Sequence, residues 1–144
     1  MNIIKWGIAL LLSVFFIFMG VQKFGSENEI FATIAAKSGI GLFEPSVRIL
    51  VGVAELIAAV LLLIPVARFF GALLGLGILF GAIGFHLSPW LGIFVPMEPG
   101  GDPSPMLFIM AIFFTGINVV ALNLEKIRIR RTFPARPTSQ AEAE

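Results

Sequence analysis

The stretch RILVGVAELIAAVLLLIPVAR, residues 48–68, carries one charged side chain, Glu55, between the two arginines at its ends. A bilayer core of about 30 Å needs roughly 20 mostly apolar residues in a helix. Residues 47–64 meet this requirement and predict a membrane-spanning helix. Because Pro65 and the charged Arg68 follow closely, we expect a tight turn that sends the chain back as an antiparallel neighbour.

Three more long apolar runs lie on either side of this stretch and predict spans over residues 3–24, 69–87 and 106–124. Four spans indicate an all-α fold, a transmembrane four-helix bundle, in a single domain over residues 1–131. The polar tail over residues 132–144 is expected to be disordered. The first run could instead be a secretory signal, but it is longer than a typical signal core and no cleavage motif follows it.

The composition agrees with a membrane protein, since 58% of the residues are hydrophobic, 13% are charged and the net charge is +1. These values argue against an ordinary soluble enzyme and against a nucleic-acid-binding protein. The chain has no cysteine and one histidine. It therefore cannot itself supply a disulfide, a thiolate metal site, an iron–sulfur cluster or a haem held by two imidazoles.

The distribution of Lys and Arg predicts the orientation in the membrane. With four spans, both termini lie on one side. That side would carry seven of the ten basic residues, namely Lys5, Arg68, Lys126, Arg128, Arg130, Arg131 and Arg136. The opposite side would carry Lys23, Lys37 and Arg48. We therefore expect both termini to be cytoplasmic.

The two outer connections differ in character. Residues 27–37 predict a short amphipathic helix with Ile30, Phe31 and Ile34 on one side. Its apolar side could lie on the membrane, or the segment could be a plain surface helix. Residues 88–105 are rich in proline but also apolar, so we expect them to fold over the outer end of the bundle without forming a long helix.

Small residues occupy two faces of the third predicted span. Gly71 and Gly75 share one face, and Gly77, Gly81 and Gly84 lie on a roughly opposite face. Small residues let helices approach closely in lipid. This pattern predicts a helix packed between two neighbours, although glycine is also generally frequent in membrane spans.

The charged residue inside a span is the first candidate for function, because such residues are costly in lipid. Glu55 lies about 10 Å deeper than Arg48 along a helix with 1.5 Å rise per residue. Lys23, Arg48 and His86 each lie near the outer end of a predicted span. We therefore expect these three side chains to gather above Glu55, where they could bind an anionic or quinone-like headgroup or relay a proton.

Structural roles are the alternative for each of these residues. Lys23 and Arg48 could extend to lipid headgroups, and His86 could be an interfacial residue with its hydrogen bond satisfied. Glu55 could belong to an ion pair that fixes the register of the helices. Thr115 and Asn118 in the fourth span are expected to form hydrogen bonds between helices.

The chain resembles the DoxX-like family of small bacterial membrane proteins. The resemblance rests on Lys23-Phe24, on RILVGVAEL and LLLIPVAR within residues 48–68, and on GAIGFH at residues 81–86, and it covers about residues 8–124. It implies a four-helix, multi-pass protein of the bacterial cytoplasmic (inner) membrane. It also implies that Lys23, Arg48, Glu55 and His86 match the recurrent polar positions of the family.

The resemblance further implies a link to quinone-dependent redox or oxidative-stress complexes. In this hypothesis the chain is an accessory subunit that binds a quinone headgroup or relays a proton, while partner subunits carry the electrons; whether the chain is itself an enzyme stays open. Two other hypotheses remain: a non-catalytic assembly protein, and a small-solute transporter that would act as a homo-oligomer. The sequence predicts no covalently bound cofactor, no metal and no nucleic-acid partner.

Overall fold

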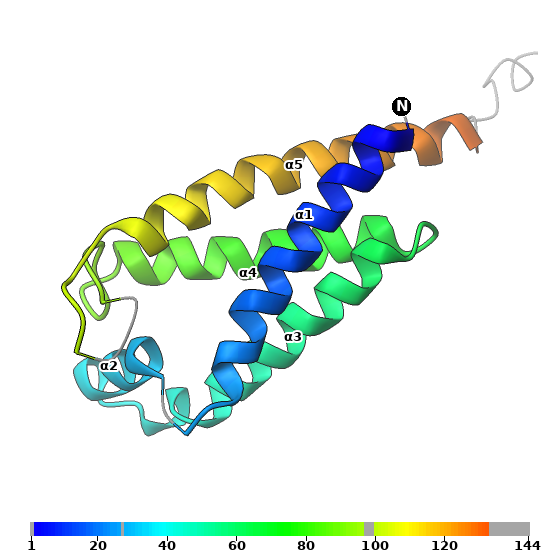
Figure 1. Cartoon of the computed structure of the whole chain (residues 1–144). Helices are drawn as coiled ribbons and strands as arrows, with labels where there is room; N and C mark the ends of the chain where they lie inside the picture. The colour runs from blue at the N-terminus through cyan, green and yellow to red at the C-terminus, as the bar shows by residue number, and fades with distance from the viewer. Residues whose placement is uncertain (1, 27, 97–99, 133–144) are drawn as a thin grey trace, which may run out of the picture.

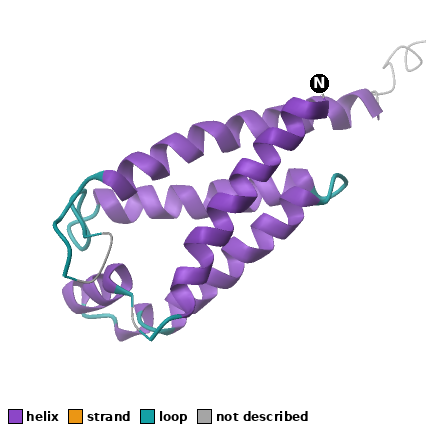
Figure 2. Cartoon of the chain, viewed as in Figure 1, coloured by secondary structure: helices purple, strands orange, loops and turns teal. Residues whose placement is uncertain are grey.

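The computed structural model describes residues 2–26, 28–96 and 100–132, and most of these are helical (Figures 1 and 2). Within this part of the chain, four helices are long and apolar enough to cross a membrane. They are α1 (Asn2–Val21), α3 (Ser46–Leu63), α4 (Arg68–Leu87) and α5 (Met106–Thr132). The predicted all-helical fold with four spans is therefore confirmed. Three shorter helices complete the described chain: η1 (Gln22–Phe24), α2 (Glu29–Ser38) and η2 (Gly41–Phe43).

The predicted spans agree with these helices to within a few residues, except at the end of the fourth. Helix α5 continues past residue 124 to Thr132. The extension contains Glu125, Lys126 and Arg128, residue types that favour a helix. The predicted disordered tail lies, from residue 133 on, outside the described residues.

The long helices form two packed pairs that diverge. Helix α1 packs along α3 and α4 packs along α5, and α3 is joined to α4 by the turn after Leu63 (Figure 1). From this turn α3 and α4 separate, and α2 lies at the wide end between them (Figure 1). We call this the α2 end of the bundle. The other end, with the N-terminus and the α3–α4 turn, is called the terminal end.

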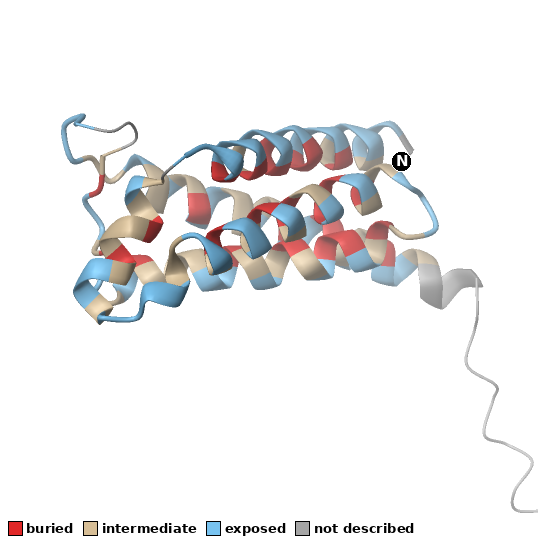
Figure 3. Ribbon diagram, turned by 90° about the horizontal axis from the view of Figure 1, so that it is seen from below, coloured by how far each residue is buried: buried red, intermediate tan, exposed pale blue. Residues whose placement is uncertain are grey.

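Buried residues lie on the inner faces of the helices, and exposed residues lie on the outside (Figure 3). The main core contains Leu12, Phe16, Ala58, Leu62 and Leu79. The exposed faces carry many large apolar side chains. Apolar outer surfaces are typical of helices that contact lipid, because the lipid tails are themselves apolar.

The two glycine faces of α4 behave differently. A Cβ added at Gly71 would lie 2.7 Å from the Leu62 backbone nitrogen, and one at Gly75 would lie 2.6 Å from the Phe16 ring. These two glycines allow close packing, as predicted. A Cβ added at Gly77, Gly81 or Gly84 would meet no atom within 4 Å. Helix α4 packs between α3 and α5, so the predicted two neighbours are confirmed. The second glycine face takes no part in either contact, because α3 diverges from α4 there (Figure 1).

The connections cover the α2 end. Helix α2 begins at an N-cap in which Asn28 Oδ1 accepts hydrogen bonds from the backbone nitrogens of Ile30 and Phe31. Its apolar face points inward, and Ile34 packs with Leu91 and Val95 in a second core. The expected amphipathic helix and the inward fold of the proline-rich connection are thus confirmed. Glu27 and residues 97–99 lie outside the described residues.

Two polar residues of α5 were expected to bond between helices, and one of them does. Asn118 is fully buried, and its amide is oriented to donate to the Ala72 carbonyl at 3.2 Å and to accept from the Leu76 backbone nitrogen at 2.9 Å. Thr115 instead donates to the carbonyl of Ala111 in its own helix at 2.6 Å. Its interhelical role is therefore not observed.

Candidate functional site

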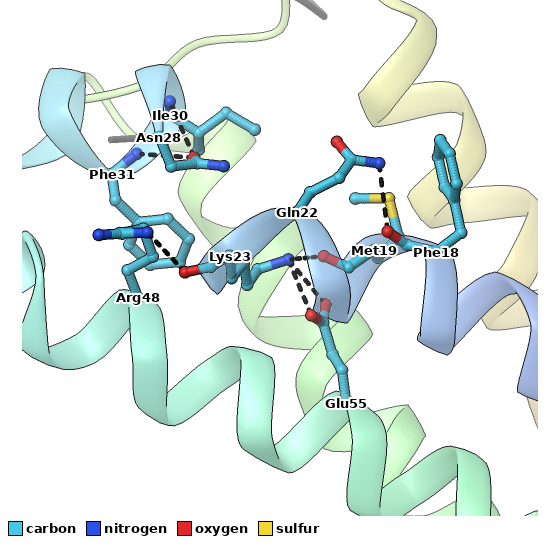
Figure 4. A network of polar contacts seen from close by, with 9 residues as sticks. All are labelled: Phe18, Met19, Gln22, Lys23, Asn28, Ile30, Phe31, Arg48 and Glu55. Carbon is cyan, nitrogen blue, oxygen red and sulfur yellow. Dashed lines mark hydrogen bonds and ion pairs between the residues drawn. The ribbon is translucent and has the colours of Figure 1, made fainter. Parts of the chain in front are cut away.

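An ion pair between Lys23 and Glu55 lies at the α2 end of the bundle. Lys23 Nζ is 2.8 Å from Glu55 Oε2 and 3.0 Å from Oε1, and it also donates to the Met19 carbonyl at 3.0 Å (Figure 4). Lys23 is 7% exposed and Glu55 is 5% exposed. Both side chains point inward from η1 and α3, so Lys23 does not extend to the lipid headgroups.

Two glycines bring these elements together. A Cβ on Gly52 would lie 2.9 Å from the Cβ of Lys23, and a Cβ on Gly20 would lie 3.2 Å from the Gly52 carbonyl oxygen. Because neither glycine carries a side chain, α1 and α3 approach closely where η1 begins. Because of this close approach, the Lys23 ammonium bonds to Glu55 on α3 and to the Met19 carbonyl in the preceding turn of α1 at the same time.

Arg48 donates hydrogen bonds to the backbone near this ion pair. Its Nη1 donates to the carbonyl oxygens of Lys23 and Gly25, and its Nε is 2.7 Å from Glu44 Oε1 (Figure 4 shows the bond to Lys23). The carbonyls at a helix C-terminus lack partners within the helix. Arg48 satisfies them and is itself buried, so the alternative that it extends to lipid headgroups is also wrong.

His86 lies on the last turn of α4 and is buried. Its Nδ1 is 2.8 Å from the Gly92 carbonyl oxygen, and its ring lies beside that of Phe108. Since a carbonyl only accepts hydrogen bonds, Nδ1 carries a proton. In the neutral ring Nε2 is then an acceptor, and in the protonated ring it is a donor. No contact among the described residues joins His86 directly to Lys23 or Glu55.

The ion pair and His86 both line a cavity of about 700 Å³. Of the described residues that line it, three are polar or charged: Lys23, Glu55 and His86. The rest are apolar or glycine and come from α1, α2, α3, α4, α5 and the segment after α4. Apolar clefts of this size with a few polar groups are typical of small-molecule sites. Three of the four predicted residues therefore line one cavity, whereas Arg48 does not line it and instead bonds to the backbone carbonyls of Lys23 and Gly25.

A second polar cluster, at the terminal end, was missed in the sequence. Glu125 is 1% exposed. Its Oε2 lies 2.7 Å from Arg128 Nε, and its Oε1 lies 3.7 Å from both Lys5 Nζ and Arg68 Nη1. The Arg68 guanidinium also lies 4.4 Å from the ring centre of Trp6. A signal was available, since Glu125 follows Asn118 and Ala121 on one helical stripe at i, i+3 and i+7.

The terminal cluster ties four elements together through backbone contacts as well. Arg68 Nε donates to the Leu62 carbonyl at 2.8 Å, and Lys5 Nζ donates to the Leu124 carbonyl at 3.1 Å. Arg128 Nη2 donates to the carbonyl of Pro65 in the α3–α4 turn at 2.8 Å. These contacts give the terminal cluster a structural role.

Comparison with known proteins agrees with the resemblance seen in the sequence. The model of the DoxX-like family matches residues 8–96, which is more than half of the chain. The match contains all of α2, α3 and α4 and the residues of the ion pair, and it ends before α5. No curated protein and no solved structure gives a significant match. The chain is a membrane protein that belongs to the DoxX-like family.

Proposed function

We propose that this protein binds a lipid-soluble molecule with a small polar head in the cavity at the α2 end, and that a quinone is this molecule. The supporting observation is the cavity itself: about 700 Å³, lined mostly by apolar side chains, with Lys23, Glu55 and His86 on its wall. A quinone has a head with two carbonyl oxygens and an apolar tail. The head can bond to the polar residues of the wall, and the tail can pack against the apolar residues.

The polar residues suit such a head in chemical terms. The Lys23 ammonium carries three N–H donors, and a quinone carbonyl is an acceptor. His86 Nε2 can accept a hydrogen bond from the hydroxyl of a reduced head, or donate one when the ring is protonated. Glu55 neutralises Lys23, so that a buried positive charge is not left without a partner. These residues can hold a head and take up or release a proton at Nε2.

In this proposal the protein is an accessory subunit of a quinone-linked redox or oxidative-stress complex. A bound quinone would supply the redox chemistry, accepting or giving up electrons. The chain has no cysteine and one histidine, so electrons would pass to or from a partner subunit. The contribution of this chain is to bind and orient the head and to exchange a proton with it.

Lipid analysis of the purified protein tests the proposal. We expect protein isolated gently from its native membrane to retain about one quinone per chain, since such sites are few per protein. The measurement is chromatography with mass spectrometry of the extracted lipids, compared with nanodiscs of the same membrane lacking the protein. A quinone-to-lipid ratio equal to that of the control nanodiscs would count against this function.

We further propose that residues 1–131 form one domain of the bacterial cytoplasmic membrane with both termini in the cytoplasm. This places the α2 end on the outer side, in accord with the excess of Lys and Arg at the terminal end. A C-terminal fusion to green fluorescent protein is expected to fluoresce, and a fusion to alkaline phosphatase to be inactive. The reverse pair of results would overturn the orientation.

A further inference from the structure

The residues that line the cavity are buried on one side and exposed on the other. On the α1 and α5 side its walls include Phe15, Phe16 and Ala111, which are all buried. On the α3 and α4 side its walls include Leu50 and Phe70, which are 67% and 62% exposed. A residue that lines a cavity and is also exposed marks the place where that cavity opens. The opening therefore lies between α3 and α4, along the length of helix that a membrane would surround.

Glycines form the α4 edge of this opening. Gly77 and Gly81 line the cavity, are exposed, and would carry a Cβ that meets no atom within 4 Å. At Gly71 and Gly75 on the same helix, atoms of neighbouring helices occupy the space that a side chain would need. The missing side chains at Gly77 and Gly81 thus leave free space beside α3 instead of allowing helix contact.

The polar and apolar parts of the cavity lie at different levels. Lys23 and Glu55 are near the α2 end, as is His86 at the end of α4, and this end is covered by Ile34 and Leu91. Phe70 lies on the first turn of α4, close to the terminal end. A molecule with its head among the polar groups would therefore direct an apolar tail away from α2, along α4.

We propose that the ligand enters from the bilayer between α3 and α4, past Gly77 and Gly81, and that its tail remains in this opening after the head has bound. This inference rests on the proposed function and narrows it to long-tailed, membrane-dissolved molecules. Entry from lipid needs no passage for the tail through water. It also assigns Gly77 and Gly81 a specificity role, because their missing side chains make room for the tail.

Leucine substitutions at the opening test this inference. We expect Gly77→Leu and Gly81→Leu to weaken the Kd of a decyl-substituted benzoquinone by about tenfold or more, since overfilled apolar sites are strained. The Kd of a methyl-substituted benzoquinone should stay unchanged. The matched control is Gly84→Leu, whose Cβ also meets nothing but which does not line the cavity.

Binding can be read from quenching of Trp90, which adjoins the cavity residue Leu91. Each variant would carry Trp6→Phe, so that the fluorescence of the other tryptophan does not interfere. Circular dichroism of each variant in nanodiscs would verify that its helices are intact. Equal loss of affinity for both probes, or no loss for either, would overturn the lateral opening while leaving the proposed function in place. Failure of both probes to bind the Trp6→Phe protein would overturn the function as well.

Discussion

Replacement of Glu55 by alanine is expected to lower the free energy of unfolding by about 3–5 kcal/mol. The change leaves the Lys23 ammonium buried with no carboxylate within reach, and breaking a buried pair by removing one partner costs about this much. Equilibrium unfolding in mixed detergent micelles containing SDS would measure it. Asp102→Ala is a suitable control, because Asp102 is an exposed acidic residue in the connection before α5.

Replacement of both partners should reverse most of this loss. In Lys23→Met/Glu55→Leu the two charges are exchanged for apolar side chains of similar size, and such exchanges are often neutral or stabilising by about 1–4 kcal/mol. We expect a folded protein with stability near that of the original chain. If Glu55→Ala alone cost less than about 1 kcal/mol, as exposed ion pairs do, the pair would not be isolated from water as the structure shows.

Replacement of Glu125 by alanine is expected to cost at least as much, about 3–5 kcal/mol. It removes the carboxylate that lies between Lys5, Arg68 and Arg128 and leaves their positive charges close together. The same unfolding measurement applies. The control is Lys126→Ala, which changes the next residue on an exposed position and should alter stability by no more than about 0.5 kcal/mol.

The terminal cluster and the cavity should also be separable. The proposed head-binding residues lie at the α2 end, and Glu125 does not line that cavity. The Kd of the decyl-substituted benzoquinone should therefore be unchanged for folded Glu125→Ala protein in nanodiscs. A stability loss below about 1 kcal/mol, or a weaker Kd with intact helices, would contradict the purely structural role given to this cluster.

Much of the fold could be predicted from the spacing of charges. Lipid cannot solvate a charged side chain, so long runs without charge, such as residues 69–87, identify helices directly. The sequence also placed Lys23 near Glu55, since the rise per residue puts Glu55 one to two helical turns below the outer end of the spans. The direct ion pair was not predicted, because it depends on the close approach of the backbones at Gly20 and Gly52. The end of α5 was less accessible, since a helix that leaves the membrane can continue in water.

Other features depend on packing that a periodic pattern does not contain. Periodicity groups Gly77, Gly81 and Gly84 on one face, but only the divergence of α3 from α4 shows that no helix covers that face. Arg48 bonds largely to backbone carbonyls, and these partners have no sequence signature. The burial of Glu125 was not predicted, because a charged residue at the end of a span usually faces the interface. Its helical stripe with Asn118 nevertheless pointed inward.

The most direct test of the account compares quinone binding by the original chain and by Lys23→Met/Glu55→Leu in nanodiscs, using Trp90 quenching by the decyl-substituted benzoquinone. The account predicts saturable binding to the original chain and a Kd weakened by about tenfold or more in the folded double variant, since hydrogen bonds to charged groups contribute about 1.5–3 kcal/mol. Equal Kd values for the two proteins would contradict the claim that this ion pair forms the polar end of a ligand site.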